Sequence, residues 1–337
     1  MAVHAMFEPA PRHVGQYENE EVILPPSFYT SAQPSQGKSN PYGQATYAGT
    51  VASPDATGYP PGFLDERAQR VDSTFQEPAS HQAYYGANST ADWQKNQRES
   101  WHGVDYMYHG QLDFETFYRR YCETLLGVDE SVGVILDYLD EAGLADSTLV
   151  IYMGDNGFSF GEHGLIDKRQ FYEESVKVPF LVRYPEVLEG GQTIERMVQN
   201  IDVAPTVLEL AGVQKPEQMQ GRSIVPLLKD QTADWRDRIF YEYYWEYAYP
   251  QTPTMHGVRT DRYKYIRYHG VWDTNEFYDL QEDPYEMHNL IASPAHQDTI
   301  RAMLGELYDW METTGGMQIP LKRTMQKHVD HRNRGTY

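Results

Sequence analysis

The sequence has 337 residues, of which 40% are hydrophobic and 13% aromatic, enough to bury the core of one large or two modest domains. Its net charge of −21 argues against a nucleic-acid partner, because the phosphates would be repelled. The single cysteine, Cys122, excludes an internal disulfide and a thiolate metal cluster. No run of eighteen apolar residues occurs, so we expect no membrane span, and residues 1–11 lack the pattern of a signal peptide.

A long polar segment occupies roughly residues 31–100. It is rich in Ser, Gly, Pro, Gln, Asn and Tyr and poor in aliphatic residues. Because such a composition buries little apolar area, we interpret the segment as a loop-rich excursion and not as core.

The middle of the chain carries an α/β pattern. Apolar residues recur with helical spacing over residues 112–143. Residues 148–153 form a short apolar run typical of a buried parallel strand, and residues 178–183 resemble a second strand. A further helix is expected to begin at Asp202. Helix, strand, loop, strand and helix in this order predict an α/β sheet with helices on its faces.

The composition changes after about residue 235. Four short aromatic segments, separated by turn residues, predict antiparallel strands. A helix is expected to follow near the C-terminus. The expected segments are 239–245, 256–259, 263–268 and 276–280 for the strands and about 295–312 for the helix. We therefore divide the chain into an α/β domain over residues 1–234 and a small α+β subdomain with an antiparallel sheet over residues 235–337.

The segment after the first predicted strand carries most of the chemistry. It contains Gly-Asp-Asn-Gly, in which Asp155 and Asn156 place a carboxylate and an amide oxygen side by side. Hard oxygen ligands suit Ca²⁺, or less readily Mg²⁺, and do not suit zinc. The flanking glycines would let the backbone turn tightly around an ion. The same tetrapeptide is also compatible with a simple turn that binds nothing.

A cation and an imidazole follow on the same loop. Lys168 and His163 belong to Gly-Glu-His-Gly-Leu-Ile-Asp-Lys-Arg, a few residues beyond the proposed metal ligands. A metal ion, a lysine and a histidine together would make a local anion site within an acidic protein.

Gly-Asp-Asn-Gly followed by Gly-Glu-His-Gly-x-x-x-Lys-Arg resembles the sulfatase family of the alkaline phosphatase superfamily. The motif most resembles that of bacterial enzymes that act on sulfated sugars, including N-acetylglucosamine-6-sulfatases. Other segments follow the order of the family, and the resemblance covers most of the chain outside the polar excursion. These segments are residues 2–9, 178–185, 200–207, 221–223, 258–265 and 276–284.

The resemblance implies a fold and a set of roles. The fold is a mixed sheet flanked by helices, as in sulfatases. Asp155 and Asn156 would ligate Ca²⁺, Lys168 would contact the sulfate, and His4 would contact the sulfate or protonate the leaving alcohol. His163 would belong with the substrate-binding residues, although packing within its loop is the simpler interpretation.

Two features of the family are absent from the sequence. No Cys/Ser-x-Pro-x-Arg motif occurs, although the family converts that residue to formylglycine and uses it as the nucleophile. No Asp-Asp pair occurs to complete the metal shell, and Cys122 lies on the first predicted helix. We therefore expect this to be the C-terminal portion of a sulfatase that lacks the first strands of the sheet. We also expect it to be inactive alone, and a second polypeptide that carries the other half is one of the open interpretations.

Alternative functions remain open at this point. A phosphodiesterase or phosphonate hydrolase of the same superfamily would keep a similar sheet. A fragment or degenerate paralogue that binds sulfated glycans without cleaving them is the other alternative. The expected partner is a sulfated carbohydrate or another sulfate ester, and only the resemblance implies a periplasmic or extracellular location.

Overall fold

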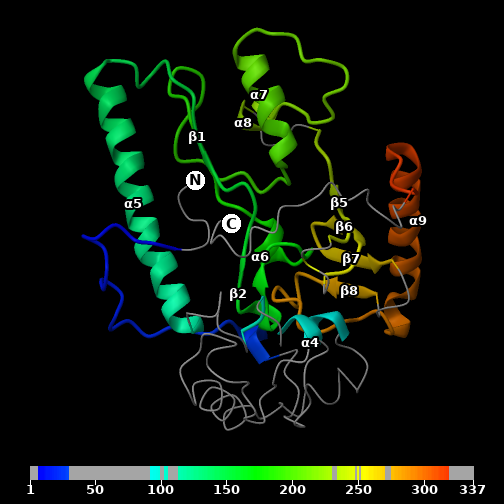
Figure 1. Cartoon of the computed structure of the whole chain (residues 1–337). Coiled ribbons are helices and arrows are strands. Elements are labelled where there is room, and N and C mark those ends of the chain that lie inside the picture. Colours follow the sequence, from blue (N-terminus) through cyan, green and yellow to red (C-terminus); the bar gives the residue numbers. More distant parts are fainter. Residues whose placement is uncertain are drawn as a thin grey trace, which may run out of the picture.

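The structure is a computed structural model that describes residues 7–29, 92–98, 102–104, 113–229, 234–246, 249, 252–269 and 275–318. Helices alternate with antiparallel sheets along the chain, which confirms the predicted mixed α/β class (Figure 1). Among the helices that the structure describes, none has the length and apolar content needed to cross a lipid bilayer.

The longest element is α5 (Phe114–Glu141), which matches the helix predicted over residues 112–143. Asp113 caps its first turn by accepting a hydrogen bond from the Thr116 backbone N–H at 2.7 Å. Gly143 follows the last turn with φ 65°, a left-handed conformation that glycine adopts without strain. The start of α5 is buried, while much of its remainder is exposed.

The two predicted strands of the α/β part form a two-stranded sheet of β1 (Val150–Met153) and β4 (Phe180–Arg183). They pair antiparallel, with Tyr152 opposite Leu181, so the expectation of a parallel strand is wrong for the pairing that is described. Direction was misjudged because an apolar run reports burial and not the orientation of its neighbour.

Between β1 and β4 the chain makes a compact excursion that includes a hairpin. It consists of β2 (Ser159–Phe160), the 3-10 turn η2 (Glu162–Gly164), β3 (Ile166–Asp167) and the short helix α6 (Glu173–Val176). Figure 1 places α6 near the middle of the molecule, between α5 and the C-terminal sheet.

After β4 the chain forms a small helical layer. The turn η3 (Asn200–Asp202) leads directly into α7 (Val203–Leu210), as expected from Asp202, and α8 (Val225–Lys229) follows. One core cluster joins this layer to β4 through partly buried Phe180 and Val182.

The C-terminal part is a four-stranded antiparallel sheet in the order β5-β6-β7-β8, which confirms the four predicted aromatic strands. The strands and the final helices are β5 (Arg238–Tyr243), β6 (Met255–Thr260), β7 (Tyr263–Tyr268), β8 (Glu276–Asp279), η4 (Pro294–His296) and α9 (Gln297–Thr314). Helix α9 covers one face of the sheet (Figure 1).

The opposite face of this sheet packs against the excursion that contains α6. Its core cluster combines residues from both predicted parts of the chain, namely Trp93, Leu165, Phe171, Tyr172, Met255, Ile266, Tyr268 and Tyr278. The division at residue 235 stays a prediction, but this shared core ties the C-terminal sheet directly to the segment that carries the predicted site.

Part of the predicted polar excursion is helical. Helix α4 (Asp92–Arg98) lies within residues 31–100, where we expected loop. It forms there because Trp93 inserts into the shared core and stacks on Tyr172, with ring centroids 6.5 Å apart. The turn η1 (Pro26–Tyr29) precedes this excursion, and residues 31–91 lie outside the described part of the chain.

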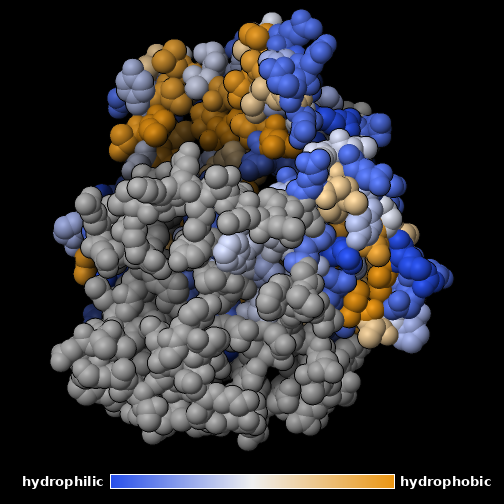
Figure 2. Space-filling view, turned by 45° about the vertical axis from the view of Figure 1, so that its right-hand side comes forward, coloured by the Kyte–Doolittle hydropathy of each residue, from blue (hydrophilic) through white to orange (hydrophobic). Residues whose placement is uncertain are grey.

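One face of the β1–β4 sheet and the adjacent part of α5 present apolar side chains to solvent. Leu181 is 64% exposed and Val134 69% exposed, and Ile135, Tyr138 and Tyr152 are exposed as well. Apolar residues gather at the top of Figure 2, the end at which Figure 1 places α7, α8 and the C-terminal half of α5. Among the described residues, β1 and β4 pair only with each other.

Candidate functional site

The predicted metal ligands lie immediately after β1, on an exposed turn. Asp155 Oδ1 accepts a hydrogen bond from the Asn156 backbone N–H at 3.0 Å, and Asn156 Nδ2 donates to the Gly157 carbonyl at 2.7 Å. Both side chains are exposed. The turn therefore presents a carboxylate and an amide to solvent.

The backbone of this turn is held by the segment that contains α6. The Gly157 N–H donates to the Ser175 carbonyl at 3.0 Å, and the Phe158 N–H donates to the Glu174 carbonyl at 2.8 Å. A Cβ atom at Gly157 would lie 2.0 Å from the Glu174 carbonyl oxygen. Position 157 therefore needs glycine for this close approach of two backbone segments.

Lys168 lies close to the turn because of the β2–β3 pairing. This antiparallel ladder places Asp167 opposite Ser159, three residues after Asn156. Lys168 follows β3 directly, so at about 3.3 Å per residue the paired backbone lies roughly 10 Å along the strand from the Asp155–Asn156 turn. This pairing places the backbone at Lys168 beside the segment that follows Asp155 and Asn156, and their joint role in one site stays a prediction.

His163 lies in the hairpin turn, away from solvent. It is 2% exposed, and its ring stacks on Tyr172 with centroids 4.0 Å apart. Burial, together with the charge of Lys264, lowers the pKa of His163 to about 3, so the imidazole is neutral at physiological pH. These contacts favour a packing role, and its contact with substrate stays a prediction. His4 lies outside the described residues.

Beside Lys168 the structure shows a charged cluster around Asp167. Asp167 forms ion pairs with Arg169 and with His102 Nδ1, the latter at 3.3 Å. The guanidinium of Arg169 also lies over the ring of Tyr249, 3.2 Å from its centroid. Burial alone would raise the pKa of Asp167, but His102 and Arg169 outweigh burial and lower it.

Part of this cluster was detectable in the sequence and part was not. Asp167 and Arg169 flank Lys168 in the Asp-Lys-Arg triplet, so the charge pattern around the predicted lysine was a usable signal. His102 and Tyr249 reach the cluster from distant segments. No spacing in the sequence points to these two residues.

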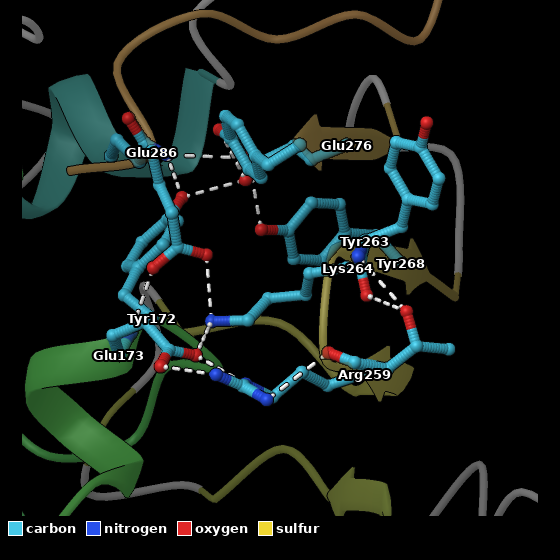
Figure 3. A network of polar contacts seen from close by, with 11 residues as sticks. Tyr172, Glu173, Arg259, Tyr263, Lys264, Tyr268, Glu276 and Glu286 are labelled. Atoms are coloured by element: carbon cyan, nitrogen blue, oxygen red, sulfur yellow. Dashed lines mark hydrogen bonds and ion pairs between the residues drawn. The ribbon is translucent and has the colours of Figure 1, made fainter. Parts of the chain in front are cut away.

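The buried carboxylate of Glu276, on β8, accepts hydrogen bonds from three tyrosines, of which Tyr172 and Tyr268 are labelled in Figure 3. The hydroxyls of Tyr172, Tyr268 and Tyr278 donate to Glu276 at 2.8, 3.0 and 2.9 Å. Burial raises the pKa of Glu276 to about 7, although the three hydroxyls act in the opposite direction. Because Tyr172 also stacks on His163, this network connects the hairpin turn to strands β7 and β8.

The side-chain oxygens of the Asp155–Asn156 turn could supply part of a calcium coordination shell. Calcium takes six to eight oxygen ligands, and the turn offers two side chains of the right chemistry. Within the described segments, no group of three or more His, Cys, Asp or Glu side chains is arranged to hold a metal ion. Asp155 and Asn156 therefore fit as a fraction of a shell whose other ligands would come from elsewhere.

Comparison with protein families identifies two matches that overlap at the candidate site. A profile of the family described as "Sulfatase" matches residues 44–213, half of the chain. A profile described as "N-sulphoglucosamine sulphohydrolase, C-terminal" matches residues 161–313. The predicted resemblance is thereby confirmed.

Individual relatives agree with these families. An N-acetylglucosamine-6-O-sulfatase of Bacteroides thetaiotaomicron is 40% identical over 183 residues, which are 53% of this chain and 33% of that protein. A multifunctional alkaline phosphatase superfamily protein of Trinickia caryophylli is 30% identical over 226 residues, 63% of this chain and 44% of that protein. The chain thus spans between a third and a half of the length of these relatives.

A solved structure, described as a complex with its substrate D-glucosamine-2-N,6-O-disulfate, superposes with a TM-score of 0.68 at 28% identity. The superposition covers 96% of this chain and 66% of that one. The described elements therefore follow the fold of that protein over almost their whole extent.

Proposed function

Because the chain belongs to the sulfatase family of the alkaline phosphatase superfamily, we propose that it carries part of the active site of a sulfuric ester hydrolase. The proposed substrate is a sulfated sugar. The names of the Bacteroides relative and of the substrate complex support this class. The observation that carries the proposal is the β2–β3 pairing, which brings the backbone at Lys168 beside the segment that follows Asp155 and Asn156.

The proposed roles follow from charge. Cleavage of a sulfate ester breaks a bond between sulfur and the alcohol oxygen, and negative charge then develops on the leaving oxygen. The ammonium of Lys168 would bind and orient the sulfate and offset its charge. His4, in its protonated imidazolium form, would donate a proton to the leaving alcohol.

Asp155 and Asn156 would bind Ca²⁺ through their side-chain oxygens, with Mg²⁺ as the less suitable ion. A bound dication would supply additional positive charge next to the sulfate. The carboxylate and the amide already face solvent on a turn whose backbone is fixed by residues 174–175. Binding therefore requires little rearrangement of the turn itself.

We propose that this polypeptide alone turns over sulfate esters negligibly. It contains no Cys/Ser-x-Pro-x-Arg motif to supply a formylglycine nucleophile, and no Asp-Asp pair to add further metal ligands. A separate polypeptide that supplies both would complete the site. Measurable hydrolysis of an aryl sulfate by the purified chain in the presence of Ca²⁺ would contradict this proposal.

Binding of N-acetylglucosamine-6-sulfate, measured by calorimetry with Ca²⁺ and again with a chelator, tests the substrate class. We expect weak binding that requires the sulfate and falls on removal of Ca²⁺. Lys168→Ala should weaken it by about tenfold or more, since a charge-assisted contact to an anion is lost. Lys177→Ala, at an exposed lysine nearby, is the matched control and should bind normally.

Several outcomes would count against the site. Equal binding of unsulfated N-acetylglucosamine would show that the sulfate is not recognised. Unchanged binding by Lys168→Ala would show that this lysine does not contact the sulfate. Preference for N-acetylglucosamine-6-phosphate over the sulfate would favour a phosphoester substrate instead.

A further inference from the structure

A buried ion network lies where the C-terminal sheet meets α6 (Figure 3). Arg259 on β6 and Lys264 on β7 are directly opposite each other in the antiparallel register. Two like charges in that position repel each other. Glu173, the first residue of α6, lies between them and binds Arg259 Nε at 2.9 Å and Lys264 Nζ at 2.8 Å.

A second carboxylate completes the network from the other side. Glu286 Oε1 lies 2.7 Å from Lys264 Nζ, and both side chains are fully buried. An ammonium without partners at this depth would be strongly unfavourable. Burial alone would raise the pKa of Glu173, but Lys264 and Arg259 outweigh it and lower that pKa to about 2. Glu173 is therefore held in place as a charged group.

The network also grips the backbone of α6. The Glu173 N–H donates to Glu286 Oε2 at 2.7 Å, so one carboxylate holds both Lys264 and the first turn of this helix. The Glu174 carbonyl accepts a hydrogen bond from the Phe158 N–H at 2.8 Å, and the Ser175 carbonyl accepts one from the Gly157 N–H at 3.0 Å. A continuous set of contacts thus leads from the sheet, through α6, to the turn next to Asn156.

We propose that Lys264 and Glu286 are positioning residues for the Asp155–Asn156 turn. They fix the first turn of α6, and α6 fixes the turn that presents the two oxygen ligands. This inference rests on the proposed function, because it assigns the C-terminal sheet a task at the proposed metal site. It also gives a role to Lys264, within residues 258–265, and to Glu286, which lies two residues beyond the segment 276–284.

The backbones of α6 and of the segment after the Asp155–Asn156 turn are too close to move independently. Gly157 has no space for a Cβ atom against the Glu174 carbonyl, so the two backbones are in direct contact. Any displacement of Glu173 moves residues 174–175 with it, because all belong to a single helical turn. The position of the Asp155–Asn156 turn therefore depends on the position of α6. The position of α6 in turn depends on the ion pairs of its first residue, Glu173.

Lys264→Met tests the proposal in the full chain, with two measurements. Hydrogen exchange followed by mass spectrometry on a peptide that covers residues 154–160 reports on the turn without any metal. Calorimetric titration with Ca²⁺ reports on the site. We expect exchange in this peptide to accelerate, and Ca²⁺ affinity to fall by about tenfold, the size of effect known for groups that orient metal ligands.

A matched control separates positioning from general stability. Arg236→Met removes another largely buried ion pair, with Asp202 directly before α7. It should lower the melting temperature but leave exchange of residues 154–160 and Ca²⁺ affinity unchanged. If Lys264→Met and Arg236→Met have the same effect on the turn, the proposal is overturned.

The remaining outcomes are also decisive. If the wild-type chain binds no Ca²⁺, the proposed metal site fails, while exchange still decides whether Lys264 positions the turn. If wild type binds Ca²⁺ and Lys264→Met changes neither measurement, positioning fails and the metal site stands. Should Lys264→Met not fold, Glu286→Gln replaces it, and normal exchange of residues 154–160 in that variant would overturn the proposal.

Discussion

Replacing Glu276 with Gln should flatten the dependence of stability on pH between pH 5 and pH 8. In the wild type this carboxyl group is 1% exposed and accepts hydrogen bonds from Tyr172, Tyr268 and Tyr278. Its pKa is raised to about 7, first by burial and in smaller part by Glu286. The folded state therefore keeps a proton on Glu276 at a pH where the unfolded chain has already lost it.

The sign and size of the effect follow from linkage. An acid with a raised pKa in the folded state stabilises the fold most at low pH, and this contribution is lost as pH rises through the folded pKa. For a shift from 4.5 to about 7, the loss between pH 5 and pH 8 is about 2.5 kcal/mol. Gln cannot titrate and has a similar shape, so the variant should not lose this contribution.

Urea unfolding of both proteins at pH 5, 6, 7 and 8 measures the difference. Other raised carboxyls, Glu174 and Glu286, contribute to both curves and largely cancel when the two proteins are compared. The free energy of unfolding of Glu276→Gln should approach or exceed that of the wild type as pH rises. Two parallel curves, separated by a constant amount at every pH, would refute the reasoning.

Three further substitutions test local features by their effect on the free energy of unfolding. Gly157→Ala should destabilise by roughly 1–3 kcal/mol, because the new Cβ would lie 2.0 Å from the Glu174 carbonyl; a neutral effect would mean that the backbones are less tightly packed. Gly127→Ala, on α5 with open space around it, should stabilise by about 0.5–1 kcal/mol. Asp113→Ala should cost about 1 kcal/mol by removing the N-cap of α5, and Asp113→Asn should retain most of that stability.

The elements with strong local patterns were predictable from the sequence. Helix α5 follows from its apolar spacing and from Gly143 beyond its end, and the four C-terminal strands follow from aromatic segments between turns. Helix α4 was not predictable from its own composition, because Trp93 stabilises it through contacts with residues far along the chain. Strand direction in the β1–β4 pair was likewise set by partners that the apolar run does not encode.

The candidate site divides in the same physical way. Asp155, Asn156 and Lys168 could be proposed from their residue types and their spacing within one loop, and their roles stay predictions. The ion network was not, since Glu173 and Glu286 are 113 residues apart and only folding brings them together. Candidate ligands grouped in one loop can be proposed from the sequence, whereas contacts between distant segments are seen only in the folded structure.

The net charge of −21 affects how the exposed apolar face of the β1–β4 sheet behaves in solution. Strands with an unpaired edge and an uncovered apolar face tend to associate with one another. At low ionic strength, mutual repulsion between such acidic molecules opposes this association. Added salt shortens the range of the repulsion to about 8 Å at 0.15 M, while the attraction between apolar surfaces persists. The chain should therefore be most soluble in dilute buffer, with light scattering that rises as salt is added.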